Sequence, residues 1–344
     1  MTGGRGAPKG RPAEREGAEA AGERDLWRDD APIRVGISTC LLGESVRWDG
    51  GHKRDRYLTD VLAPYFEWVP VCPEVEVGME IPRPPVRLVR QGDEVRLVEP
   101  KGGKDWTRAM QSYAARRLRG LAALELCGYV LKRGSPSCGM ERVKVYGEKG
   151  MAEKNGTGLF AAALLRRFGS LPVEEEGRLN DARLREAWIE RVFAYRRLRS
   201  LLEGRPSRGR LVAFHTAHKL QLLAHSQTHY RRLGRLVAEA KRIPEATLRE
   251  HYEAEFMAAL ARPATPRRHV NVLQHALGHL RGRAEPAVSK ELQQLVQDYG
   301  RGLVPLVVPL TMLRHYVKRL EVSYLAGQVY LDPHPKELML RNHV

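Results

Sequence analysis

The stretch LCGYVLKRGSPSCGM, residues 126–140, contains the pattern from which the first half of the chain is built. An apolar run of β-strand type leads into a turn of small residues, and Cys138 lies in that turn. Two earlier apolar runs also lead to a cysteine: IRVGIST (33–39) is followed by Cys40, and WVPVCPEV (68–75) contains Cys72. Ligands of α/β sheets gather where the strands end, so these three thiols are expected at one edge of a sheet.

Helical segments separate these strands. Residues 105–125 carry apolar side chains at helical spacing, and residues 156–169 form a second such segment, closed by Gly169. Strands that alternate with helices predict an α/β domain with a mostly parallel sheet flanked by helices. We place this domain at residues 32–170.

The pattern changes after residue 170. Residues 171–344 contain a series of long segments with helical periodicity and few β-type runs, which predicts an all-α second domain. Residues 1–31 hold mostly Gly, Ala, Glu, Arg and Pro. Such a segment has too little apolar surface to offset its ordering entropy, so we expect a disordered tail.

Charge and hydropathy restrict the partners. The net charge is +17, of which residues 1–170 carry +6 and residues 171–344 carry +11. This excess favours a nucleic acid as partner, although a generally basic surface would produce the same count. No run approaches the roughly 18 apolar residues of a membrane span, and the N-terminus lacks a signal peptide. We therefore expect a cytoplasmic protein without a membrane partner.

The four cysteines offer a three-thiolate site. Cys127 begins its apolar run instead of ending it, so a strand would place it at the opposite edge, as a buried apolar residue. Cys40, Cys72 and Cys138 could hold zinc with a water, or an iron–sulfur cluster with one iron left open. They could also be unrelated core residues, and their spacing alone does not decide between these alternatives.

The residues around these cysteines resemble a known family. GISTCLLGESVRWDGGHK, PVCPEVEVGMEIPRPPVRL and GYVLKRGSPSCG occur in the same order in thiouracil desulfidases, and the likeness covers residues 33–165. LVAFHTAHKLQLLAHSQTHYRRLG resembles the helical domain that is fused to this domain in bacterial tRNA 4-thiouridine desulfidases.

The resemblance implies a chemistry. Cys40, Cys72 and Cys138 would hold a 4Fe–4S cluster, and its open iron would bind the thiocarbonyl sulfur of 4-thiouridine in tRNA while water replaces the sulfur. Glu74 would handle protons, and Ser135, favoured over Ser137, would bind the base or the attacking water. The alternative for Glu74 is a solvated loop carboxylate, and for Ser135 a role in stabilising the turn.

Three further residues are candidates for substrate contacts. Asp49 and Lys53 lie in the turn RWDGGHK, and Arg83 lies in PRPP. Ordinary turn chemistry explains all three equally well.

The helical half contains a predicted RNA-binding stripe on one face of a single long helix, continued by basic residues. Its members are His215, His218, Lys219, His225, His229, Arg231 and Arg232. Hydrogen bonding between helices and metal binding are the alternatives for the histidines. We expect tRNA and not DNA as the partner, and the sequence does not indicate an oligomeric state. The competing functions are a non-catalytic RNA-binding protein with a structural metal and a desulfidase of free thiouracil only.

Overall fold

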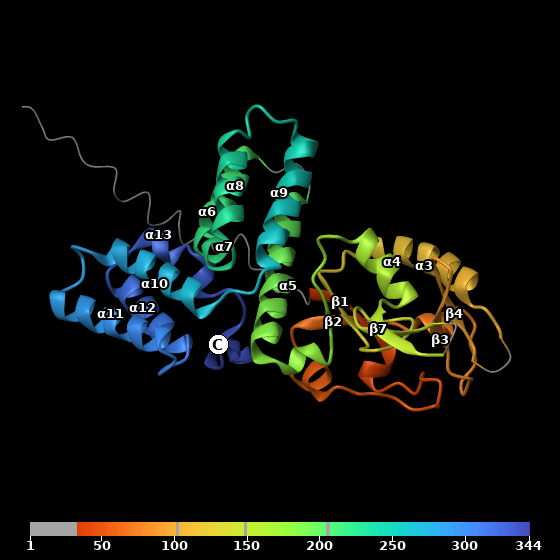
Figure 1. The fold of residues 1–344 in the computed structure, drawn as a ribbon. Helices are drawn as coiled ribbons and strands as arrows, with labels where there is room; N and C mark the ends of the chain where they lie inside the picture. Colours follow the sequence, from red (N-terminus) through yellow and green to blue (C-terminus); the bar gives the residue numbers. More distant parts are fainter. Residues whose placement is uncertain (1–32, 101–102, 148–149, 204–206) are drawn as a thin grey trace, which may run out of the picture.

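The computed structural model describes residues 33–100, 103–147, 150–203 and 207–344 (Figure 1). The predicted fold class is confirmed, because an α/β unit is followed by a region composed of helices. The predicted tail, residues 1–31, lies outside the described residues.

A four-stranded parallel sheet forms the centre of the α/β unit. Its order is β2 (Phe66–Val71), β1 (Ile33–Ser38), β5 (Gly128–Leu131) and β8 (Val173–Glu175), with every neighbouring pair parallel. The β5 strand is buried throughout, as the apolar run of its sequence predicts for a central strand.

The predicted boundary at residue 170 needs correction. The β8 strand lies beyond it, and Leu131 of β5 pairs with Glu175 of β8 in the same sheet. The sequence hides this strand because VEE contains two glutamates, whose side chains are nevertheless buried.

A second sheet was not predicted. Its order is β4 (Glu94–Val98), β3 (Arg87–Gln91), β6 (Val143–Tyr146) and β7 (Ala152–Gly156). β3 with β4 and β6 with β7 are antiparallel hairpins, and β3 with β6 is parallel. These strands carry many charged residues on an exposed face, so no continuous apolar run marks them.

The predicted helices of this unit are present, with shorter bounds. α3 (Thr107–Ala122) and α4 (Leu159–Arg167) pack together, and the rings of Tyr113 and Phe160 lie 6.1 Å apart. Short helical turns occupy the remaining connections; they are η1 (Thr39–Leu42), η2 (Tyr57–Val61), α2 (Pro73–Glu76) and η3 (Arg178–Asn180).

The helical region begins with a long helix, α5 (Ala182–Leu202), which lies between the α/β unit and the remaining helices (Figure 1). The later elements are α6 (Arg208–Ala217), α7 (Lys219–His225), α8 (Gln227–Ala238), α9 (Glu245–Leu260), α10 (Pro266–Leu280), α11 (Pro286–Gly300), α12 (Val307–Arg319), α13 (Ser323–Ala326), η4 (Val329–Leu331), η5 (Lys336–Leu338) and η6 (Leu340–Asn342).

The α5 helix shares its hydrophobic core with the sheet. Trp188 is 1% exposed and donates a hydrogen bond from its indole nitrogen to the Pro172 carbonyl at 3.1 Å. A side chain at Gly128 of β5 would meet Val192 at 2.8 Å, so glycine permits the close approach of strand and helix. One core therefore runs from the sheet through α5 into α6, α8 and α9, and a second core joins α7 to α10–α13.

Candidate active site

The three predicted ligand cysteines follow neighbouring strands. Cys40 lies in η1 directly after β1, Cys72 follows β2 and precedes α2, and Cys138 lies in the turn after β5. The strands are in register at these ends, because Ser38 of β1 pairs with Val71 of β2. The parallel sheet thus carries all three thiols at its carboxyl edge, where ligands of such sheets bind.

The thiols influence one another's pKa. Burial and then the neighbouring Cys72 raise the pKa of Cys40 to about 11. Burial raises the pKa of Cys138 well above its usual value, and Glu74, Cys72 and Cys40 add to the effect. Burial also raises the pKa of Cys72. A bound cation would favour the thiolates that this environment otherwise disfavours.

The chemistry of the donors limits the kinds of metal that the site could hold. In the part of the chain that the structure describes, no three His, Cys, Asp or Glu side chains form a group that could hold a metal ion. A tetrahedral zinc would draw its thiolates together at about 2.3 Å from the ion. A cluster binds each thiolate through a different iron, so its ligands lie further apart. Three soft thiolate donors at one sheet edge fit an iron–sulfur cluster by their chemistry, as they also fit zinc.

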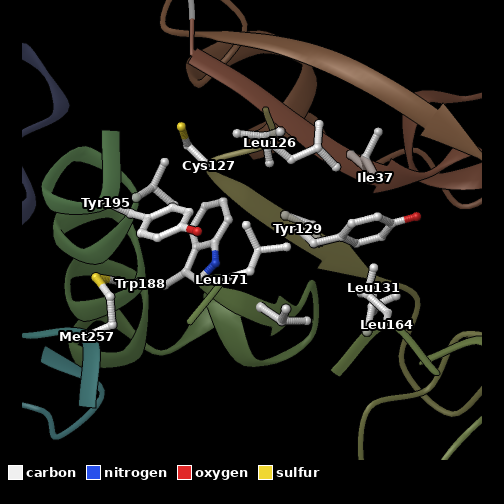
Figure 2. Close-up of a cluster of buried hydrophobic side chains, with 14 of the residues drawn as sticks. Ile37, Leu126, Cys127, Tyr129, Leu131, Leu164, Leu171, Trp188, Tyr195 and Met257 are labelled. Carbon is white, nitrogen blue, oxygen red and sulfur yellow. The ribbon is translucent and has the colours of Figure 1, made fainter. Parts of the chain in front are cut away.

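Cys127 lies elsewhere. It precedes β5, is 1% exposed, and lies close to Tyr195 of α5 in the hydrophobic core (Figure 2). Burial raises the pKa of its thiol to about 12. The expectation that Cys127 is a buried core residue is confirmed.

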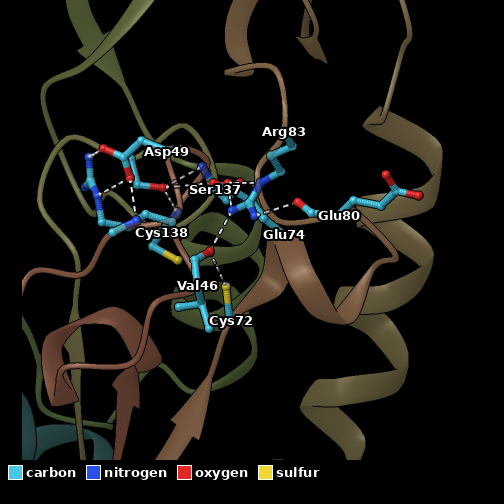
Figure 3. A network of polar contacts seen from close by, with 11 residues as sticks. Val46, Asp49, Cys72, Glu74, Glu80, Arg83, Ser137 and Cys138 are labelled. Carbon is cyan, nitrogen blue, oxygen red and sulfur yellow. Dashed lines mark hydrogen bonds and ion pairs between the residues drawn. The ribbon is translucent and has the colours of Figure 1, made fainter.

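Glu74 belongs to α2, two residues after Cys72, and its carboxylate is held at both oxygens (Figure 3). Arg83 donates to Oε2 from Nη2 at 2.7 Å and from Nε at 3.2 Å. The Ser137 hydroxyl donates to Oε1 at 3.0 Å, and that of Ser135 lies 3.5 Å from the same oxygen. The side chain of Glu74 is only 14% exposed, so it is not the solvated loop carboxylate of the alternative interpretation.

Ser135 and Ser137 differ in their hydrogen bonds. The Ser135 oxygen accepts from the amides of Ser137 at 3.2 Å and Cys138 at 3.1 Å, which stabilises the turn. Its hydroxyl proton remains available to point toward Glu74. Ser137 is fully buried and makes the shorter contact with Glu74. The motif favours Ser135 over Ser137, yet the two alternating serines of SPSC both reach the same carboxylate.

Arg83 makes its contacts within the protein, and its role in substrate binding stays a prediction. Its side chain is 5% exposed, and its remaining donors contact the carbonyls of Val46 at 3.0 Å and Glu80 at 3.1 Å. The Val46 carbonyl also lies 4.0 Å from the Cys72 sulfur. Arg83 therefore joins Glu74 to the loop that runs between Cys40 and η2.

Asp49 and Lys53 lie in that loop. Hydrogen bonds from Arg47 and then from the Gly51 amide lower the pKa of the exposed Asp49 carboxylate, so its oxygens are used within the turn. Lys53 donates its amide to the Cys40 carbonyl at 2.9 Å, and its side chain is exposed. Lys53 is thus beside the site, and its role in substrate binding stays a prediction.

The histidine stripe does not form as predicted. The single helix expected over these residues is divided into α6, α7 and α8, with the breaks at His218 and Ser226. The Ser226 hydroxyl caps α8 by accepting from the His229 amide, and a serine before a helical run is a recognisable N-cap signal. The four histidines therefore do not share one helix face.

All four histidines are buried and bonded within the protein. His215 contacts the Tyr252 hydroxyl at 3.3 Å, and His218 contacts the Phe214 carbonyl at 2.7 Å. His225 and His229 contact the Arg262 carbonyl and Glu255. The contacts of His215, His225 and His229 join separate helical segments, as the alternative of hydrogen bonding between helices requires, whereas His218 bonds within its own segment. Buried imidazoles cannot reach an RNA. Lys219 is half-buried, whereas Arg231 and Arg232 are exposed on α8 and stay predicted RNA contacts.

Fold and site together define an α/β unit with a thiol-lined sheet edge, joined to a helical region. Residues 35–176 match the family model described as 2-thiouracil desulfurase, and residues 219–335 match a family described as a protein of unknown function, DUF1722. The chain belongs to the 2-thiouracil desulfurase family.

Individual relatives cover parts of the chain. The uncharacterized protein YbgA of Escherichia coli is 34% identical over 48% of this chain and 98% of its own length. The uncharacterized protein YbbK of Bacillus subtilis is 30% identical over 42% of this chain and 97% of its own length. A solved structure described as the 4Fe–4S-dependent thiouracil desulfidase TudS is 35% identical, covering 43% of this chain and 94% of that chain, with a TM-score of 0.36.

Among the described residues, no helix combines the length and the apolar character that crossing a membrane requires.

Proposed function

We propose that this chain is an iron–sulfur-dependent desulfidase that converts 4-thiouridine in tRNA to uridine. The observation that carries the proposal is the meeting of three neighbouring thiols with a buried, oriented carboxylate at the carboxyl edge of the parallel sheet. Membership of the 2-thiouracil desulfurase family supports the same class of reaction.

Cys40, Cys72 and Cys138 would hold a 4Fe–4S cluster. When bound, such a cluster with three protein ligands supplies an iron with an open position, a Lewis acid suited to a soft thiocarbonyl sulfur. The reaction replaces C=S by C=O: the oxygen comes from water, the sulfur leaves as sulfide, and no electrons are exchanged.

Glu74 takes the proton from the attacking water. The Arg83 guanidinium and the serine hydroxyls fix its two oxygens, so the carboxylate does not have to reorient when the water arrives. The oxygen of Ser135 is held by two turn amides, which aims its single hydroxyl proton at Glu74 or at the pyrimidine. Ser135 therefore orients the water and the base relative to Glu74.

The tRNA part of the proposal rests on charge. The helical half carries a net +11, and α8 exposes Arg231 and Arg232, of which Arg232 also pairs with Glu255 at 3.5 Å. Basic helices of this kind bind phosphates without reading sequence. The thiolated base of a folded tRNA would have to leave the stack to reach the sheet edge.

A second candidate is a desulfidase of free thiouracil, which the description of the family favours. A third, a non-catalytic RNA-binding protein, requires a site without turnover. All three are separated by incubating anaerobically prepared, iron-loaded full-length protein with thiolated tRNA or with free thiouracil and following the loss of thiocarbonyl absorbance. Turnover of tRNA supports the proposal, and turnover of thiouracil alone supports the second candidate. The absence of turnover of both substrates supports the third.

A variant sharpens the distinction. Arg231→Glu in the full chain is expected to weaken turnover of tRNA and leave that of free thiouracil unchanged. Arg90→Glu, an exposed arginine on β3, is the matched control. Equal loss on both substrates in Arg231→Glu would contradict an RNA-binding role for α8.

A further inference from the structure

The turn that carries Cys138 is held at both ends by the strand beyond it. The Met140 amide, after the cysteine, donates to Glu175 Oε1 at 2.8 Å. The Arg133 amide, before it, donates to Glu176 Oε2 at 2.7 Å, and the Lys132 ammonium bonds to Oε1 of the same glutamate. Glu175 ends β8 and Glu176 follows it directly, so two adjacent carboxylates form hydrogen bonds to the two ends of one loop.

Both carboxylates are enclosed. Glu175 is 2% exposed, and Glu176 keeps 14% of its side chain exposed beside Lys132. Burying charge is costly without partners, and these partners are two main-chain amides and the Lys132 ammonium, all from the loop itself. The polar contacts of β8 therefore favour one conformation of residues 132–140.

The hydrogen bonds within the loop do not fix the position of its two ends. The Ser135 oxygen binds the amides of Ser137 and Cys138, and the Gly139 amide donates to the Ser135 carbonyl at 2.8 Å. These bonds fix the shape of the turn around the cysteine. The start of α4 also holds the middle of the loop, because the Phe160 and Ala161 amides both donate to the Ser137 carbonyl at 3.1 Å. The two ends are held separately, by β5 up to Leu131 and by the Glu175 contact at Met140.

We infer that Glu175 and Glu176 are positioning residues for Cys138, the pair that holds its thiol in line with Cys40 and Cys72. Glu175 and Glu176 place the loop whether or not the protein is a desulfidase. Only the use of that placement, to bind a cluster, rests on the proposed function. These residues stand next to η3 and α5, so the first residues of the connection to the helical region hold part of the thiol site.

The test measures thiol reactivity in the metal-free full-length chain, which separates it from any question of turnover. Wild type, Glu175→Ala and Glu176→Ala are treated with a maleimide, and each cysteine is followed by peptide mass spectrometry. Loss of a hydrogen bond to a buried charged acceptor predicts labelling of Cys138 roughly tenfold faster in both variants. Cys127, in the core at the far end of β5, is the internal control and is expected to keep its rate.

Two more variants provide the rescue and the matched control. Glu175→Gln retains an oxygen that can accept from the Met140 amide, so Cys138 should react nearly as slowly as in wild type. Glu67→Gln alters an exposed glutamate of β2 in the same sheet and should change nothing. Iron reconstitution adds a spectroscopic signature, because the alanine variants should lose their visible cluster absorbance to a chelator faster than wild type.

The outcomes are distinct. Unchanged Cys138 labelling in folded alanine variants would overturn the inference, even if the protein desulfurates thiouracil. Faster labelling supports it, even if the protein has no activity. If the alanine variants do not fold, hydrogen exchange of the unmodified chain decides: slow exchange at the Arg133 and Met140 amides is expected, and exchange as fast as at the exposed Gly134 would refute these hydrogen bonds.

Discussion

At the scale of single residues, the site contains a buried carboxylate, Glu74, that accepts hydrogen bonds at both of its oxygens. Glu74 would be costly to bury alone, and Arg83 compensates its charge at 2.7 Å. The same arginine reaches the Val46 carbonyl, which lies against the Cys72 sulfur. One guanidinium thus joins the proposed proton-transfer residue, Glu74, to the loop beside the proposed ligand Cys72.

Glu74→Gln tests the proton-transfer role. We expect kcat to fall by about 100- to 10,000-fold, the usual contribution of a general base, with the cluster retained. Steady-state kinetics and iron content measure the two effects. A variant with wild-type kcat would remove Glu74 from the chemistry.

Arg83→Met tests the positioning role. Removing one partner of a buried pair costs about 3–5 kcal/mol, so the free energy of unfolding should fall by that order. The double variant Arg83→Met/Glu74→Gln should recover part of the loss, because no uncompensated carboxylate remains. Urea titrations of the full chain provide the comparison, and additive effects would exclude a direct coupling.

Cys138→Ser and Cys127→Ser form a matched pair of substitutions. The first is expected to lose the cluster and the activity, since a hydroxyl is a poor iron ligand. The second should keep both and lose about 1–3 kcal/mol of stability, because it buries a hydroxyl. Iron analysis and thermal unfolding distinguish them; bleaching by Cys127→Ser would show that the ligand set is wrong.

At the scale of elements, α6, α7 and α10 and the junctions beside them bury histidines, most of them in neutral form. Burial lowers the pKa of His215 to about 4 and those of His218 and His269 to about 3. Burial opposes charge on His225 as well, but Glu190 reverses the effect and raises its pKa. The lowered pKa values outnumber the raised one in these helices.

The sign of the pH dependence follows. A histidine with a lowered folded pKa stabilises the fold above its ordinary value of 6.5 and loses that contribution as the pH falls toward 3–4. We expect the melting temperature to fall as the pH is lowered from about 6.5 to 4. His269→Gln should flatten this decline. His225 contributes oppositely, with stability lost as the pH rises through its raised pKa.

Particular residues show how far the sequence determined these elements. The position of the three cysteines at one sheet edge could be predicted, because each lies at or near the end of an apolar run, and Glu74 lies beside them because it is two residues from Cys72. Ser137, Glu175 and Glu176 could not, since their roles depend on contacts between segments distant in the chain. The prediction of a histidine stripe was wrong because helical periodicity does not reveal where a helix is interrupted. Ser226 supplies the N-cap that marks one of these interruptions.

At the scale of the whole molecule, the sheet and the helical region are not separable at residue 170. A chain that ends there loses β8, both glutamates that hold the Cys138 loop, and the Trp188 contact with the sheet. We expect chain 1–170 to unfold at a lower temperature than the full chain, or to aggregate, as circular dichroism and light scattering would show. A stable, cooperative fragment would contradict the shared core.

Salt provides a test at the same scale. Affinity for a polyanion falls steeply as salt displaces its counterions, whereas binding of a neutral base does not. We expect the KM for tRNA to rise with salt and that for free thiouracil to stay constant. Arg231→Glu should lower the logarithmic salt slope by about one, because a single arginine neutralises a single phosphate. Equal slopes for the two substrates would argue against phosphate binding.

The α5 helix, residues 182–202, lies between the two matched families and shares a core with both sides of the chain. The α5 helix therefore fixes the separation and the orientation between the arginines of α8 and the thiols of the sheet edge. One residue inserted into α5 would turn everything after it by about 100° and lengthen the span by about 1.5 Å. Under the proposed function, an RNA bound at α8 would then present a different nucleotide at the sheet edge, so the length of this helix would set which base reacts.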